Sequence, residues 1–220
     1  MPPIILMNDP RVLDIPVHDC GEPLIDLRHL PFVDVDDRLA DPAGAYAQLR
    51  EGVAWRLARA ARLLPEGLRL LITEGYRPID LQIKYFEEYA AELRRAHPDW
   101  TGAHLHRQAS RSLSPPEVAP HVAGAAVDVT LRTTTGTELD LGTPVNASPE
   151  DSGGACYTDA DGISPTARRN RRTLTAALAT VGLVNYPTEW WHWSYGDRYW
   201  ALATSSPRAH YGAVTFHASH

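Results

Sequence analysis

Apolar residues recur at three- and four-residue spacing in three segments of the chain, which predicts three long helices. The segments cover residues 41–64, 78–95 and 166–181. The first begins at Asp41-Pro42, and an acidic residue followed by proline is typical of a helix N-terminus. It ends at a Pro-Glu-Gly sequence, and the last segment ends at Gly182, so both carry stop signals.

Two shorter segments have the pattern of strands. Residues 68–73 form a short, mostly apolar run, as a buried strand does. Residues 125–131 alternate, which places Val127 and Val129 on one face and Asp128 on the other. We therefore expect one face of this second strand to pack in the core and the other to line a cleft.

Aromatic residues concentrate near the end of the chain. Residues 189–194 and 199–203 read as two strands joined by a hairpin turn at Gly196-Asp197. Helices and strands interleave along the sequence, which favours an α+β fold with a central antiparallel or mixed sheet packed by helices. We expect a single domain over residues 1–220, with an irregular N-terminal arm at 1–41. Residues 142–165 are rich in glycine, lack periodicity and predict a loop at the active site.

Composition narrows the function classes. The 220 residues carry 21 Lys and Arg against 27 Asp and Glu, a net charge of -6, so no basic surplus favours nucleic acid or an anionic membrane as partner. The two cysteines, Cys20 and Cys156, lie far apart, which argues against a thiolate zinc site. No signal peptide or membrane span is recognisable, so we expect a cytoplasmic protein. The sequence leaves the oligomeric state open, and a homo-oligomer is compatible with it.

A candidate metal site emerges from residues that are unusual for their surroundings. Asp128 lies within an apolar strand, where an unpaired carboxylate would be costly, so it needs a strong partner such as a cation. His121 comes just before the strand, and Gly124 allows the chain to bend back. Taken alone, a His and an Asp at this spacing are more often a hydrogen-bonded histidine and a turn residue.

The sequence Glu189-Trp-Trp-His192 supplies a second carboxylate and imidazole among aromatic rings. His121, Asp128 and His192 together have the composition of a catalytic zinc site with an open position, and Glu189 would be the base that takes a proton from water. Two histidines and a carboxylate also suit non-haem iron, although the adjacent Glu189 favours hydrolysis. Since positions i and i+3 of a regular strand face opposite ways, the chain must bend between Glu189 and His192.

Four motifs in order resemble the zinc D-alanyl-D-alanine dipeptidases of the VanX type. They are Gly75-Tyr76-Arg77-Pro78, His121-x-x-Gly-x-Ala-x-Asp128-x-Thr, Asn170-Arg171-Arg172 and Glu189-Trp-Trp-His192. The resemblance implies one zinc ion on His121, Asp128 and His192, Glu189 as general base, and a small peptide substrate. It also implies that Arg77 stabilises the oxyanion, a role that suits a fixed cation at a strand end.

The chain departs from this family at residues expected to bind the substrate. Asn146 stands where the family has an aspartate for the substrate ammonium, and Glu74 stands where an aspartate often precedes Gly-Tyr-Arg. An amide offers a weaker bond to an ammonium than a carboxylate does. With Tyr76, these residues are the candidate substrate contacts. The alternatives are a zinc amidase or carboxypeptidase for an N-blocked or larger substrate, in specialised metabolism for example, and a non-catalytic binding module.

Overall fold

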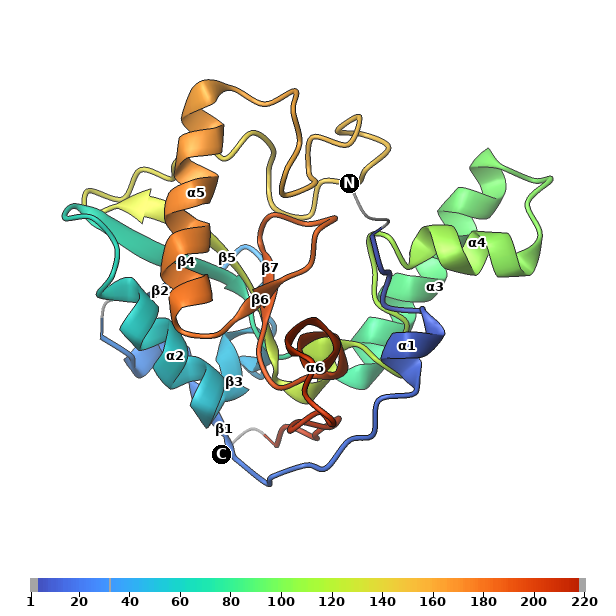
Figure 1. The fold of residues 1–220 in the computed structure, drawn as a ribbon, viewed down its shortest axis with the longest axis horizontal. Helices are drawn as coiled ribbons and strands as arrows, with labels where there is room; N and C mark the ends of the chain where they lie inside the picture. The colour runs from blue at the N-terminus through green and yellow to red at the C-terminus, as the bar shows by residue number, and fades with distance from the viewer. Residues whose placement is uncertain (1–3, 32, 218–220) are drawn as a thin grey trace.

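The computed structural model describes residues 4–31 and 33–217. Its strands are β1 (Leu24–Asp26), β2 (Val33–Val35), β3 (Gln48–Arg50), β4 (Leu68–Glu74), β5 (Ala126–Thr133), β6 (Val184–Asn185) and β7 (His192–Ser194). Five of them form one sheet in the order β2-β4-β5-β7-β6 (Figure 1). β2 runs parallel to β4 and the other neighbours are antiparallel, while β1 and β3 form a separate antiparallel pair. The prediction of an α+β fold with a mixed sheet is confirmed.

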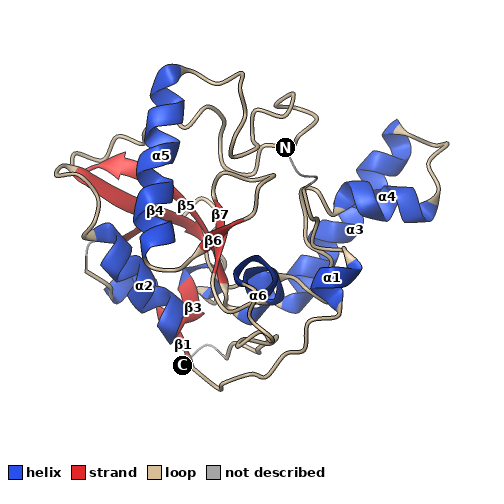
Figure 2. Cartoon of the chain, viewed as in Figure 1, coloured by secondary structure: helices blue, strands red, loops and turns tan. Residues whose placement is uncertain are grey.

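Helices lie against this sheet and at its margin. They are α1 (Pro10–Leu13), α2 (Glu51–Ala61), α3 (Ile79–Ala96), α4 (Gly102–Ala109), α5 (Pro165–Thr180) and α6 (Arg198–Thr204), with 3-10 turns η1 (Leu27–His29), η2 (Ala45–Ala47) and η3 (Pro120–Ala123). Figure 1 shows α2 and α5 together on one side, whereas α3 and α4 form a hairpin that projects at the other side. Residues 142–164 contain no helix or strand, as their composition predicts (Figure 2).

The main core lies between the sheet and the pair α2 and α5. Val53 and Leu57 of α2, Leu174 and Leu178 of α5, and Val129 of β5 are almost fully buried in one cluster. Each such side chain contributes about 1.5–3 kcal/mol through its removal from water. Because side chains alternate along a strand, packing Val129 into this core turns its neighbours on β5 to the opposite face.

The opposite face of β5 carries the polar residues. Asp128 lies in register with Glu74 of β4 on one side and with His192 of β7 on the other. A register shift between Ile72 and Glu74 interrupts the ladder, and the Thr73 hydroxyl donates to the Asp128 carbonyl at 3.2 Å. The sheet thus places three ionisable side chains in a row across adjacent strands.

The helix predicted from Asp41 begins ten residues later, so its first part was wrong. The Asp41 carboxylate accepts hydrogen bonds from the backbone N–H groups of Ala43 and Tyr46, which closes a turn rather than starting an α-helix. The next residues pair with β1 as β3, and α2 starts at Glu51. The apolar residues do recur at helical spacing, but the first of them lie in a turn and a strand and pack against the core from there.

The predicted strand at 199–203 is also wrong, because this segment belongs to α6. The Asp197 carboxylate accepts from the backbone N–H groups of Tyr199 and Trp200 and caps the first turn of the helix. Gly196 adopts a positive φ of 77°, which suits the turn expected here. An aspartate at this position serves a helix N-cap as well as a hairpin, and the sequence pattern alone did not distinguish them.

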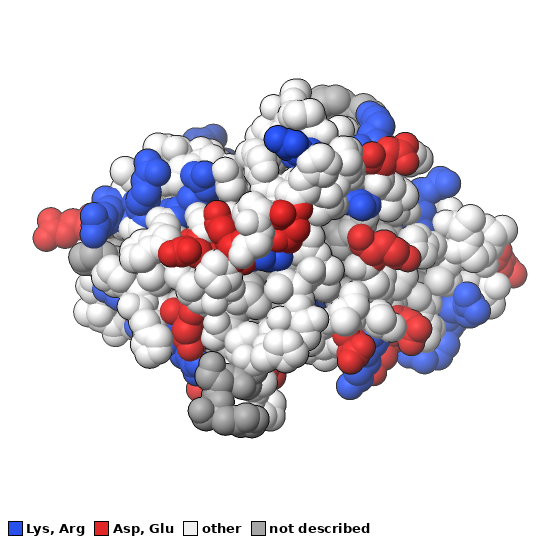
Figure 3. Space-filling model, turned by 90° about the horizontal axis from the view of Figure 1, so that it is seen from below, with Lys and Arg blue, Asp and Glu red and all other residues white. Residues whose placement is uncertain are grey.

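Charged groups of both signs are interspersed on the surface seen in Figure 3. Acidic and basic side chains alternate over that face rather than gathering in a single-sign patch. Among the described residues, no helix combines the length and apolar character needed to cross a bilayer.

Candidate metal centre and active-site cavity

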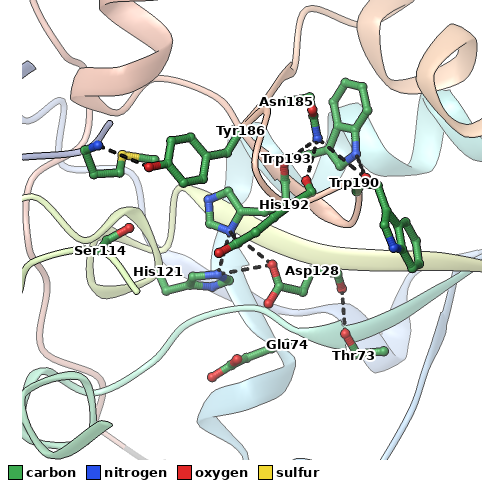
Figure 4. A network of polar contacts seen from close by, with 12 residues as sticks. Thr73, Glu74, Ser114, His121, Asp128, Asn185, Tyr186, Trp190, His192 and Trp193 are labelled. Carbon is green, nitrogen blue, oxygen red and sulfur yellow. Dashed lines mark hydrogen bonds and ion pairs between the residues drawn. The ribbon is translucent and has the colours of Figure 1, made fainter. Parts of the chain in front are cut away.

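Three potential metal ligands meet on the polar face of the sheet. His121, Asp128 and His192 are each no more than 4% exposed, and their donor atoms all lie within 4.8 Å of one another. Asp128 Oδ1 is 3.3 Å from His121 Nε2 and 3.1 Å from His192 Nδ1, and these two nitrogens are 3.2 Å apart (Figure 4). The structure therefore brings together the three residues that the sequence predicts as ligands.

Local backbone structure explains how residues far apart in sequence converge. His121 lies in η3, and Gly124 ends this turn in the left-handed region at φ 63°, so the chain bends directly into β5. Asp128 follows on β5, and His192 is its cross-strand neighbour on β7. The bend expected at Gly124 is thus present, and the sheet register supplies the third residue.

The orientation of His121 is set by the segment that follows β4. Its Nδ1 lies 2.6 Å from the carbonyl oxygen of Gly75, which fixes Nδ1–H as the donor and leaves the Nε2 lone pair facing Asp128. Gly75 is required here, because a Cβ at this position would lie 2.5 Å from the carbonyl oxygen of Gln48. The backbone N–H of Arg77 in turn donates to the His121 carbonyl at 3.2 Å.

The charges of these groups suit a bound cation. Burial raises the pKa of Asp128, but the two imidazoles outweigh it and hold that pKa below its ordinary value. Burial lowers the pKa of His192, which favours its neutral, ligating form. Burial also opposes protonation of His121, although the Asp128 charge raises its pKa overall. Two imidazole nitrogens and a carboxylate oxygen match the donor set of a catalytic zinc site with an open position.

Glu189 lies beside this donor set. The chain turns between Tyr186 and His192, with the Glu189 N–H donating to the Tyr186 carbonyl and the Tyr186 N–H donating to the His192 carbonyl. As a result the Glu189 Oε2 is 3.7 Å from His192 Nδ1, on the same side of the chain. Burial, reinforced by the Asp128 charge, raises the pKa of Glu189 well above its ordinary value. The bend required between Glu189 and His192 is therefore a turn.

Arg77 is held in a buried ion pair. Its Nε and one Nη donate to the two oxygens of Glu74 at 2.6 and 2.5 Å, and its other Nη donates to Gln82 Oε1 at 2.7 Å. Gln82 is itself fixed by donating to the Ser114 carbonyl at 2.7 Å. The Glu74 charge keeps the pKa of Arg77 raised despite burial, which alone would lower it. Arg77 is thus a cation of fixed position.

Two adjoining cavities lead to this centre. The inner one, about 30 Å³, is lined by all three ligand residues, and the outer one measures about 470 Å³. Arg77 and Glu189 line both. The inner space is sufficient for an ion or a water molecule, and the outer one for a small peptide. A larger cavity, about 740 Å³, lies between the N-terminal arm and the C-terminal segment, away from these ligands.

The predicted substrate contacts have different positions. Asn146 lines both cavities and has a positive φ of 66°, and Glu74 lines the outer cavity while it binds Arg77. Tyr76 lines neither, because its hydroxyl donates to the Val214 carbonyl at 2.7 Å and its ring contacts Phe216. The structure brings Asn146 and Glu74 to the cavity and leaves Tyr76 outside it.

Sequence analysis missed two polar residues of the site. Gln82 is 1% exposed within α3, and the sequence holds no signal that it pairs with Arg77. Asn185 donates to backbone carbonyls in the turn that carries Glu189. An asparagine just before Tyr-Pro resembles an ordinary turn residue, so its contacts became visible only in the fold.

Comparison with known proteins agrees with this geometry. A family model described as D-ala-D-ala dipeptidase (Peptidase_M15) matches residues 25–210. A D-alanyl-D-alanine dipeptidase of Synechocystis is 29% identical over 223 residues, covering 86% of this chain and 88% of that protein. One from Enterococcus faecium is 31% identical over 138 residues, covering 60% and 64%.

Among solved structures, the LdcB LD-carboxypeptidase matches with a TM-score of 0.48 at 18% identity, over 84% of this chain and 75% of that one. The family model, by contrast, spans most of the sequence, including all three ligand residues, Arg77 and Glu189. The chain therefore belongs to the Peptidase_M15 family of D-alanyl-D-alanine dipeptidases, which are hydrolytic metallopeptidases.

Proposed function

We propose that this protein is a zinc-dependent dipeptidase that hydrolyses the peptide bond of D-alanyl-D-alanine. The observation that carries the proposal is the convergence of His121, Asp128 and His192 within 4.8 Å, next to Glu189 at the inner end of a cavity. Family membership and the names of the relatives support the substrate.

His121 Nε2, Asp128 Oδ1 and His192 Nδ1 would hold the zinc ion. When bound, zinc supplies a Lewis acid that polarises the scissile carbonyl and lowers the pKa of water. The ligands leave it a net charge of about one, because only Asp128 is anionic. The inner cavity leaves space beside the three donor atoms, where a water molecule could also bind such an ion.

Glu189 moves the proton. Its Oε2 accepts a proton from the attacking water and passes it to the leaving amine, as a general base and then a general acid. Burial raises the pKa of Glu189, and a carboxylate with a raised pKa is the stronger base toward the water proton in the first half of this transfer. The buried ring of Trp191 forms an apolar part of the wall of the outer cavity beside Glu189.

Arg77 provides a positive charge for the oxygen that becomes negative during attack. Two of its nitrogens donate to Glu74 and the third donates to Gln82, which fixes the guanidinium at the wall of the cavity that Arg77 lines. On this account Glu74 orients Arg77, and Tyr76 supports the site from outside by packing against the C-terminal segment.

A second candidate function is hydrolysis of an N-blocked or larger peptide. Asn146 favours it, because this residue lines both cavities and brings an amide where a carboxylate would attract an ammonium group. The outer cavity also offers more room than two alanine residues need.

The test compares amine release from D-Ala-D-Ala and from N-acetyl-D-Ala-D-Ala by the zinc-loaded protein. Cleavage of the free dipeptide in clear preference supports the dipeptidase proposal. Preference for the blocked peptide supports the second candidate, and cleavage of neither contradicts both. The variant Asn146→Asp sharpens the result, since restoring the carboxylate should lower KM for the free dipeptide and leave KM for the blocked one unchanged.

A further inference from the structure

The turn that carries Glu189 poses a structural problem. Glu189 and His192 must both face the metal centre, yet a regular strand would direct them to opposite faces. The observed turn solves this, but it points the backbone carbonyl groups of Glu189, Trp190 and His192 toward one spot. Carbonyl oxygens that converge repel one another unless a donor lies between them.

The side-chain amide of Asn185 occupies that spot. Its Nδ2 is 2.9 Å from the Glu189 oxygen, 3.0 Å from the His192 oxygen and 3.5 Å from the Trp190 oxygen. Figure 4 shows Asn185 on the far side of His192 from His121. One amide group therefore ties together the two ends of the Glu-Trp-Trp-His segment, behind the residues that face the cavity.

Backbone and ring N–H groups also reach these carbonyls, and the His192 N–H donates to the Glu189 oxygen at 3.2 Å. Trp193 Nε1 donates to the Trp190 oxygen at 3.1 Å, and the Tyr186 N–H donates to the His192 oxygen at 3.0 Å. Among the side chains that the structure describes, it is the amide of Asn185 that donates to the Glu189 carbonyl. Each of these other donors serves one carbonyl, whereas the amide of Asn185 donates to those of Glu189 and His192 together.

The side-chain oxygen of Asn185 links the turn to the loop formed by residues 142–164. Asn185 Oδ1 accepts from the Thr158 hydroxyl at 2.5 Å, and the Thr158 N–H donates to the Pro187 carbonyl at 3.0 Å. The Trp190 N–H also donates to the Cys156 carbonyl at 3.0 Å. The same loop contributes Asn146 to the cavity wall, so Asn185 joins the wall to the turn.

We propose that Asn185 is a positioning residue, which holds Glu189 and His192 in their catalytic arrangement by donating to both carbonyl groups. The inference rests on the proposed hydrolase function. This role requires a side chain whose NH2 group can reach both carbonyl oxygens. An aspartate has the same shape, but it would bring one more acceptor against the converging carbonyls.

The experiment compares Asn185→Asp with wild type and with the matched variant Asn170→Asp. Asn170 also donates its amide to a backbone carbonyl, that of Asp140, and it lines neither active-site cavity. We expect N185D to lower kcat about 10- to 100-fold with little change in KM, and to weaken zinc binding about 10-fold in chelator competition. N170D should stay within about 3-fold of wild type.

A double-mutant cycle separates positioning from general destabilisation. If Asn185 acts through Glu189, adding N185D to Glu189→Gln lowers the residual rate by less than about 3-fold, because the base is already absent. A full additional loss, or wild-type kcat and zinc affinity in N185D, overturns the inference. If N185D does not unfold cooperatively, Asn185→Ala enters the same cycle. Inactive wild type would refute the function itself, and the chelator titration would still test Asn185.

Discussion

At the scale of single residues, the pair Arg77 and Glu74 shows how the site fixes a charge. Both side chains are at most 7% exposed, and the carboxylate accepts two parallel hydrogen bonds from the guanidinium. Removing one member of such a buried pair leaves the other uncompensated. The pair is therefore a rigid unit, and the fork geometry of arginine is essential to it.

The variant Arg77→Lys tests this geometry. Lysine keeps the positive charge but cannot bind both oxygens of Glu74 and the Gln82 oxygen together. We expect kcat to fall about 100- to 1000-fold, the cost typical of losing a donor to a developing oxyanion, with a smaller change in KM. Steady-state kinetics on D-Ala-D-Ala measure both. A variant with near-normal kcat would remove Arg77 from the mechanism.

Glu74→Gln distinguishes two roles for the carboxylate. If Glu74 orients Arg77, the amide keeps part of the pairing and lowers kcat about 10-fold, because a charge-assisted bond becomes a neutral one. If Glu74 instead binds the substrate ammonium, KM for D-Ala-D-Ala rises while KM for the N-acetyl peptide does not. We predict the first pattern, and a selective rise in KM would contradict it.

At the scale of elements, the sequence predicted those whose signals are local. The alternation around Asp128 located β5 and its polar face, and the apolar spacing before Gly182 located α5. The candidate metal ligands were chosen because a carboxylate in an apolar strand demands a partner, and their role stays a prediction. The start of α2 and the nature of α6 were not predicted, since the turn closed by Asp41 and the helix cap formed by Asp197 depend on side-chain contacts.

Site residues whose contacts depend on how the chain turns could not be predicted, even where their partners are near in sequence. The role of Asn185 depends on carbonyl groups that converge only after the turn forms. The role of Gln82 depends on Arg77, which contacts it from the segment after β4. Gly75 is a further example. Its position leaves no room for a Cβ, because the carbonyl oxygen of Gln48 in β3 lies too close. The spacing of the motifs points to the groups proposed to do the chemistry, whereas the residues that hold those groups in place are defined by the fold.

Asp197→Ala measures what the cap contributes to α6. The carboxylate accepts two backbone N–H groups and the Ser194 hydroxyl, all in a buried setting. Its loss should cost about 1–2 kcal/mol and lower Tm by a few degrees, as followed by calorimetry. Thr101→Ala, which removes the cap of the exposed start of α4, is the control and should cost less. An unchanged Tm in the Asp197 variant would contradict this role.

At the scale of the whole molecule, the two ends of the chain support the site from behind. Arg50, 3% exposed, donates to the carbonyls of Glu22, Ala123 and Gly212. These belong to the N-terminal arm, the turn after His121 and the C-terminal segment. Residues that the sequence assigned to a peripheral arm therefore help to hold the turn that presents His121, a proposed metal ligand.

Across the sheet, Asp34 of β2 binds Arg69 of β4 and Arg132 of β5 at 2.7 Å each. Burial raises the pKa of Asp34, but the two arginines outweigh it and lower that pKa below its ordinary value. A depressed pKa stabilises the fold above the unfolded-state pKa of about 4. The contribution is lost as the pH falls through the folded-state value.

We therefore expect the difference in stability between wild type and the variant Asp34→Asn to depend on pH. Wild type should exceed the variant in free energy of unfolding at pH 7, and the difference should shrink as the pH falls below about 4. Urea unfolding at both pH values measures it, with Glu66→Gln as a control in an exposed turn. A difference that stays constant with pH would show that the ion pairs do not stabilise the sheet.

The central claim is that this centre is catalytic, with Glu189 as its base, and one measurement tests it most directly. The variant Glu189→Gln is compared with wild type for zinc content and for D-Ala-D-Ala hydrolysis on the same preparations. We predict one zinc ion per chain in both proteins and a rate that falls about 100- to 10,000-fold in the variant. Normal zinc content with an unchanged rate would contradict the claim.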